Sequence, residues 1–161
     1  MARWIVTITL LIAFGWSVGA RAESPEGELF SALTAEQMAA ILQEQGYRAV
    51  VGTSEDGLPE IESGTQGLTY WVYFYDCGDA EPRACTNITF FTFLTKTDAM
   101  TLEAVNDWNL NRRFGRAYLD QNGNANLSMD IDLIGGVTRA NLEDWLLWWD
   151  DRIAKFNQHM G

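Results

Sequence analysis

Aromatic and β-branched residues dominate two neighbouring runs of the chain, residues 68–75 and 86–95. Such side chains pack well on the pleated surface of a sheet, so both runs are predicted strands that pair with each other. The first run carries large side chains on both of its faces: Leu68, Tyr70, Val72 and Phe74 on one, and Trp71, Tyr73 and Tyr75 on the other. The sheet must therefore be covered on both faces or expose an aromatic patch, and exposed patches of this kind usually mark interaction surfaces.

Two cysteines, Cys77 and Cys85, stand at the ends of the loop that joins these two strands. Facing residues of an antiparallel pair lie about 4.5–5.5 Å apart, a distance that suits a disulfide. We expect the bond to form in an oxidising compartment. Two cysteines and one histidine, His159, are too few ligands for a closed zinc site. The sequence predicts no metal site.

The compartment is predicted from residues 1–22, which have the pattern of a cleavable secretory signal peptide. Arg3 gives a positive start, an apolar stretch follows, and Ala20 and Ala22 are the small residues that a signal peptidase reads, so cleavage is expected before Glu23. The alternative is a retained membrane anchor, but a spanning helix needs roughly 20 apolar residues and this stretch is shorter. We expect a periplasmic or secreted protein with no membrane segment after cleavage.

The rest of the chain divides into a flexible lead-in at residues 23–33 and one domain at residues 34–157. Helical spacing and cap signals predict helices over about 34–46, 98–112 and 138–156, the first opening on a Thr34–Gln37 capping box. Strands are expected at 47–53, 60–63, 68–75, 86–95, 115–119 and 125–133. The predicted order is α-ββββ-α-ββ-α, an α+β fold with an antiparallel sheet.

The third predicted helix has a continuous apolar stripe. Its apolar positions are spaced alternately four and three residues apart, as a core-facing helix requires: Leu142, Leu146, Trp149, Ile153 and Phe156. The net charge of −11 argues against binding to nucleic acid or to an anionic membrane surface.

Several segments resemble the signature of the YbjN-type proteins, described as putative bacterial sensory transduction regulators. They are VNDWN at 105–109, NRRFGRAYLD at 111–120, DIDL at 130–133 and GGVT at 135–138. The resemblance implies a fold like that of type III secretion chaperones. It also implies no agreed enzymatic activity, no cofactor and no catalytic residues.

Two groups of residues are candidates for partner binding. The first is the outer set of the 68–75 strand, Trp71, Tyr73 and Tyr75, unless a helix or loop covers it. The second is Trp108, Asn109, Arg112 and Arg113, because tryptophan and arginine are favoured at interface hot spots. The alternative for the second set is structural, with Trp108 packed on the sheet, Asn109 bonded to backbone groups, and the arginines complementing the helix end.

No residue pattern indicates a catalytic centre. His159 near the end of the chain has no predicted nucleophile beside it. The carboxylate pairs, Glu60 with Glu62 and Asp130 with Asp132, occupy alternate strand positions where surface acids are expected. An unrecognised carboxylate-dependent periplasmic hydrolase is kept as the enzyme-class alternative.

A calcium loop around Gly123 is also considered, but that glycine is at the fourth position of the loop and not at the sixth. The sequence thus predicts a non-enzymatic exported protein, acting through contacts with an unidentified protein partner or with a second copy of itself.

Overall fold

The computed structural model describes residues 1, 27 and 29–161 of the chain. Apart from Met1, the predicted signal peptide lies outside the described residues, as do its cleavage site and residues 23–26 and 28 of the lead-in. No helix within the described part of the chain is long and apolar enough to cross a membrane.

The domain is built on a six-stranded antiparallel sheet with strand order β2-β3-β4-β5-β7-β6. Its strands are β2 (Val50–Thr53), β3 (Pro59–Thr65), β4 (Leu68–Cys77), β5 (Cys85–Leu94), β6 (Arg116–Leu119) and β7 (Ala125–Asp132). The helices are α1 (Ala35–Glu44), α2 (Leu102–Asn111) and α3 (Arg139–Met160). The prediction of an α+β fold with an antiparallel sheet and three helices is confirmed.

Two further strands, β1 (Leu29–Phe30) and β8 (Val137–Thr138), pair with each other in a separate small sheet. They were not predicted, because two residues are too few to show the alternation of a strand. The predicted strand at 47–53 begins only at Val50, and the predicted second helix begins only at Leu102, where the Thr101 side chain caps the backbone N–H of Ala104.

The predicted helix starts at either end of the domain are confirmed. The Thr34 backbone N–H donates to Oε1 of Gln37 over 2.9 Å, and the Gln37 N–H donates back to Oγ1 of Thr34. Thr138 accepts a hydrogen bond from the backbone N–H of Asn141 and so opens α3. This last helix continues to Met160, beyond the predicted end near Phe156.

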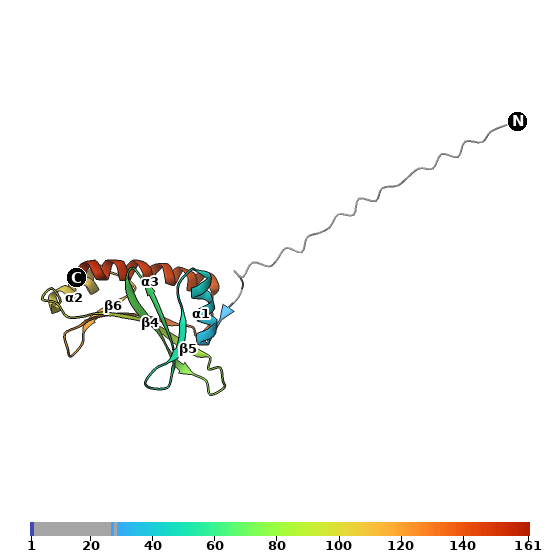
Figure 1. Cartoon of the computed structure of the whole chain (residues 1–161), viewed down its shortest axis with the longest axis horizontal. Helices are drawn as coiled ribbons and strands as arrows, with labels where there is room; N and C mark the ends of the chain where they lie inside the picture. Colours follow the sequence, from blue (N-terminus) through green and yellow to red (C-terminus); the bar gives the residue numbers. More distant parts are fainter. Residues whose placement is uncertain (2–26, 28) are drawn as a thin grey trace.

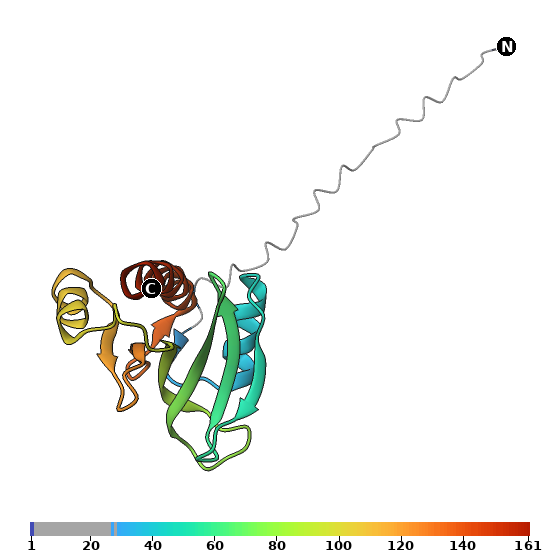
Figure 2. The same ribbon diagram turned by 60° about the vertical axis from the view of Figure 1, so that its left-hand side comes forward.

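All three helices pack on one side of the sheet, where the core lies. Figure 1 shows α3 running along this side, and Figure 2, which views α3 nearly end-on, shows α1 behind the green and teal strands. Trp149 of α3 makes an edge contact with Tyr70 of β4 and a tilted contact with Phe90 of β5, at ring centroid distances of 5.9 and 5.6 Å. The five residues of the predicted α3 stripe are all buried.

Cys77 and Cys85 form a disulfide, as predicted. They face each other where β4 pairs with β5, so the bond closes the base of the hairpin. The same hairpin carries most of the large side chains on the opposite, uncovered face of the sheet.

Candidate functional site

The second face of the sheet carries a continuous group of aromatic side chains, which we call the aromatic face. Its members are Trp71, Tyr73 and Tyr75 of β4, Phe91 and Phe93 of β5, and Tyr118 of β6. Tyr75, Phe93 and Tyr118 are 44%, 42% and 38% exposed, and the other three are half-buried. Their positions alternate with those of the core residues, so they point away from the helices.

Several aromatic rings of the face pack against one another. Trp71 is stacked on Phe93 with ring centroids 6.0 Å apart, and Tyr73 contacts Phe91 at 5.9 Å. Trp71 also faces Phe91 directly across the β4–β5 pair. Cross-strand aromatic pairs stabilise a sheet while leaving the outer surface of each ring available for contact.

A shallow hollow of about 430 Å³ lies in the aromatic face. The face's tyrosines line it together with Arg116, whose guanidinium lies 5.5 Å from the centre of the Tyr118 ring. Arg116 also donates a long hydrogen bond of 3.4 Å to Oγ of Ser128. The hollow therefore combines ring faces with one positive charge.

Acidic residues lie beside the aromatic face on β3 and within it on β7. Glu60 and Glu62 of β3 stand directly opposite Tyr73 and Trp71. Asp130 of β7 faces Thr89 of β5 and accepts a hydrogen bond from its hydroxyl. The surface thus combines aromatic rings with a negative rim on β3 and a further carboxylate, that of Asp130, in the hollow.

The rim affects the phenols of the face. Burial raises the pKa of the Tyr73 phenol, and the negative charge of Glu60 raises it further. Burial likewise raises the pKa of Tyr75, with Asp130 adding to the effect. Both phenols are therefore neutral hydrogen-bond donors at physiological pH.

Trp108 and Asn109, two predicted partner-binding residues, are engaged within the domain. Trp108 is fully buried, donates from Nε1 to the Gly115 carbonyl oxygen over 3.1 Å, and packs edge-on against Phe156. The Asn109 side chain makes two hydrogen bonds with the backbone of Ala117. These placements match the structural alternative, and Trp108 offers no surface to a partner in this conformation.

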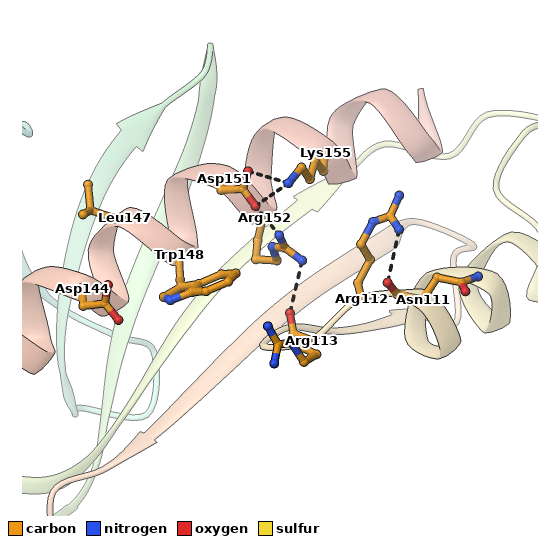
Figure 3. Close-up of a pocket in the computed structure, with 9 residues that line it drawn as sticks. All are labelled: Asn111, Arg112, Arg113, Asp144, Leu147, Trp148, Asp151, Arg152 and Lys155. Atoms are coloured by element: carbon orange, nitrogen blue, oxygen red, sulfur yellow. Dashed lines mark hydrogen bonds and ion pairs between the residues drawn. The ribbon is translucent and has the colours of Figure 1, made fainter.

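Arg112 and Arg113 lie elsewhere, on the rim of a cleft of about 770 Å³ between the end of α2 and the middle of α3 (Figure 3). The cleft is lined by Asn111, Arg112, Arg113, Asp144, Leu147, Trp148, Asp151, Arg152 and Lys155. The seven predicted partner-binding residues are therefore not brought together: three lie on the aromatic face, two lie at this cleft, and two are engaged inside the domain.

Sequence reasoning missed Arg152, although this residue connects the two sides of the cleft. It is only 5% exposed and lies beside the apolar stripe of α3. Its guanidinium donates to the Arg113 carbonyl oxygen over 3.3 Å, pairs with Asp151 and lies 5.4 Å from the Trp148 ring centre. A charged residue next to an apolar helix stripe is the signal that could have identified it.

Asp151 connects the two cations of α3. Its carboxylate lies 2.7 Å from Nζ of Lys155 and also pairs with Arg152. The hydrogen bond from Lys155 and the contact with Arg152 lower the pKa of Asp151 below its usual value. The carboxylate is therefore charged at neutral pH and keeps both cations in place.

The other residues considered for chemistry make ordinary structural contacts. The Asp120 carboxylate accepts hydrogen bonds from the backbone N–H groups of Asn122 and Asn124, as expected for a turn. His159 Nε2 lies 2.9 Å from the Ala104 carbonyl oxygen. Within the described residues, no group of three or more histidine, cysteine, aspartate or glutamate side chains could hold a metal ion.

One family model matches the chain. It is the model of the YbjN family, described as putative bacterial sensory transduction regulator, and it covers residues 34–161. No curated protein matches the chain.

Proposed function

Because the chain belongs to the YbjN family, we propose that it is a non-enzymatic, exported regulator or chaperone-like adaptor that binds another protein through the aromatic face. The family is described as a regulator, which is compatible with a protein that catalyses no reaction. The proposal includes a fold like that of type III secretion chaperones for the domain at residues 34–157.

The observation that carries the proposal is the exposure of the aromatic face. Tyr75, Phe93 and Tyr118 remain 38–44% exposed, with no helix of the described chain over them. Soluble monomers rarely leave large contiguous apolar patches uncovered unless the patch is used. Tryptophan and tyrosine are also the residues that most often anchor protein interfaces.

The rim indicates which partner fits. Glu60 and Glu62 border the aromatic face, Asp130 lies in its hollow, and the whole chain has a net charge of −11. Complementary charges favour association and like charges oppose it. We therefore propose a partner that presents apolar side chains flanked by lysine or arginine, rather than a second copy of this acidic chain.

Export and cleavage before Glu23 are part of the proposal, and the periplasm or the exterior is the compartment. The Cys77–Cys85 disulfide supports it, because disulfides persist in oxidising compartments and are rare in the cytosol. Sequencing the N-terminus of the protein isolated from its host tests this part. A start at Glu23 is expected, and an N-terminus at Met1 or Ala2 would show that the leader is retained.

The binding proposal is tested by size-exclusion chromatography with light scattering on native extracts. The wild-type protein is compared with the variants Trp71→Ala and Leu102→Ala. Leu102 is 77% exposed at the start of α2 and lies on neither candidate site, so it is a control for loss of exposed apolar surface. The wild-type protein and Leu102→Ala should elute in a complex. Trp71→Ala should elute alone, with a circular dichroism spectrum that shows it to be folded. A complex that is unchanged in Trp71→Ala would contradict the proposal, and a complex of two identical chains would favour self-association.

A further inference from the structure

The cleft of Figure 3 has a charge balance opposite to that of the chain as a whole. The chain holds 11 basic and 22 acidic residues, yet the cleft is lined by the four cations Arg112, Arg113, Arg152 and Lys155 and by only two carboxylates, Asp144 and Asp151. This local excess of positive charge requires an explanation, because the chain as a whole is acidic and the aromatic face does not extend into the cleft.

The cations of the cleft differ in what they contact. Arg152 and Lys155 share the single carboxylate of Asp151, with which each forms an ion pair. Arg112 and Arg113 make no ion pair with any described residue: Arg112 lies over Trp108 and donates to the Asn111 carbonyl oxygen, and Arg113 lies over Phe114. Both guanidinium groups therefore line the cleft without a paired carboxylate, and Figure 3 shows that they point in different directions.

The position of these groups is set by the core of the domain. Arg152 is nine-tenths buried and holds the Arg113 carbonyl oxygen by a hydrogen bond. Phe114 adopts a left-handed backbone conformation with a φ of 54° and packs against Trp145 and Trp148, with ring centroids 5.1 and 5.0 Å away. The Arg112–Arg113 segment is thereby attached to α3 on one side of the cleft, so its guanidinium groups are presented from a fixed backbone.

The lining also includes an apolar part. Leu147 is 66% exposed, and Trp148 is half-buried next to it on α3. Guanidinium groups bind carboxylates and phosphates through paired hydrogen bonds, and an adjacent leucine and tryptophan favour an apolar group on the same ligand. An inorganic ion would leave this apolar surface unused.

We propose that this cleft is a binding site for a small organic oxyanion, a carboxylate or a phosphate monoester carried on an apolar body. Arg113 binds the oxyanion, Arg112 adds positive charge to the cleft, and Leu147 and Trp148 contact the apolar body. Asp151 keeps Arg152 and Lys155 in place behind them. The site is separate from the aromatic face, so the proposal for either site can be disproved while the other stands.

The experiment is a titration of ¹⁵N-labelled protein followed by nuclear magnetic resonance, with four probes. Benzoate and phenyl phosphate carry both parts of the proposed ligand, inorganic phosphate carries only the oxyanion, and benzyl alcohol carries only the apolar body. The arginine Nε–H signals are the readout, including that of Arg152, whose Nε is buried without a hydrogen-bond partner among the described residues. Saturable shifts at Arg112, Arg113 and the Trp148 indole are expected with the two complete probes.

The variants Arg113→Gln and Lys96→Gln each remove one positive charge, and Lys96 likewise has no ion pair among the described residues but lies outside both sites. Arg113→Gln should weaken binding of phenyl phosphate at least tenfold, Arg113→Lys should weaken it less, and Lys96→Gln should leave it within twofold. Equal weakening by Arg113→Gln and Lys96→Gln would overturn the proposal. So would binding of benzyl alcohol as tight as that of benzoate, or of inorganic phosphate as tight as that of phenyl phosphate.

Discussion

The side-chain amide of Asn109 bonds to both backbone groups of Ala117, donating from Nδ2 to the carbonyl oxygen over 3.0 Å and accepting the N–H over 2.9 Å. Ala117 belongs to β6, the outermost strand on one side of the sheet. The amide therefore occupies the place of a neighbouring strand and joins α2 to this edge. An exposed edge is a hazard for aggregation that folded proteins cover in such ways.

Asn109→Ala should lower the free energy of unfolding by about 1–2 kcal/mol, because two backbone groups lose their partner. Asn109→Asp should also destabilise the domain, since it removes the donor and places a carboxylate against a carbonyl oxygen. Asn111→Ala is the matched control, because its amide bonds only within α2, to Asp107. Urea unfolding measures all three variants, and equal losses in Asn109→Ala and Asn111→Ala would contradict the assignment.

Reduction of the Cys77–Cys85 disulfide should destabilise the domain without unfolding it. The bond closes a loop with a sequence separation of 8, and the chain-entropy model gives about 2–3 kcal/mol for a loop of this size. Urea unfolding with and without a reductant, and of the double variant Cys77→Ser, Cys85→Ser, should show the same loss of stability. No shift of the unfolding midpoint in either case would show that the bond contributes nothing to stability.

Tyr70 should make the domain unstable in alkali. Burial raises the pKa of its phenol to about 12, well above the ordinary value for tyrosine, and the side chain is only 1% exposed. The unfolded chain loses this proton at lower pH than the folded one, so stability is complete below pH 10 and falls as the pH rises toward 12. The loss from this residue is about 3 kcal/mol for a shift of that size.

Tyr70→Phe removes the ionisable group and should reduce the alkaline loss of stability between pH 10 and 12. Tyr118→Phe, at an exposed position of β6, is the control and should lose stability with pH as the wild type does. Urea unfolding at several pH values measures the difference. Identical pH profiles for the wild type and Tyr70→Phe would show that burial of this phenol is not coupled to folding.

Much of the fold could be predicted because its signals are local. The alternation in β4, the Thr34–Gln37 capping box and the 4-3 spacing in α3 each depend on residues close together in the sequence. The disulfide followed from the positions of its cysteines at the two ends of one hairpin. Local rules of this kind do not depend on how the distant parts of the chain meet.

The remaining features depend on contacts between distant residues. The β1–β8 pair joins Leu29 to Thr138, and the positively charged cleft needs Arg113 and Arg152 side by side. The sequence placed Trp108 and Arg112 in one candidate group, but α2 ends at Asn111 and Arg112 has an extended backbone, so Trp108 lies in the core and Arg112 lies on the surface. Which face of the sheet the helices cover is also a tertiary property, so the exposure of Tyr75 could be stated only as one of two alternatives.

The most direct test of the aromatic face is crosslinking in the native host, with a photoreactive phenylalanine analogue in place of Tyr75 or Leu102. Tyr75 is 44% exposed on the aromatic face and Leu102 is 77% exposed on α2, so the control position is the more accessible one. Irradiation should attach position 75 to a protein with exposed lysine or arginine beside apolar residues, and Trp71→Ala should abolish that product, while position 102 gives none. Equal crosslinking from both positions, or none from position 75, would contradict the assignment of the aromatic face as the binding surface.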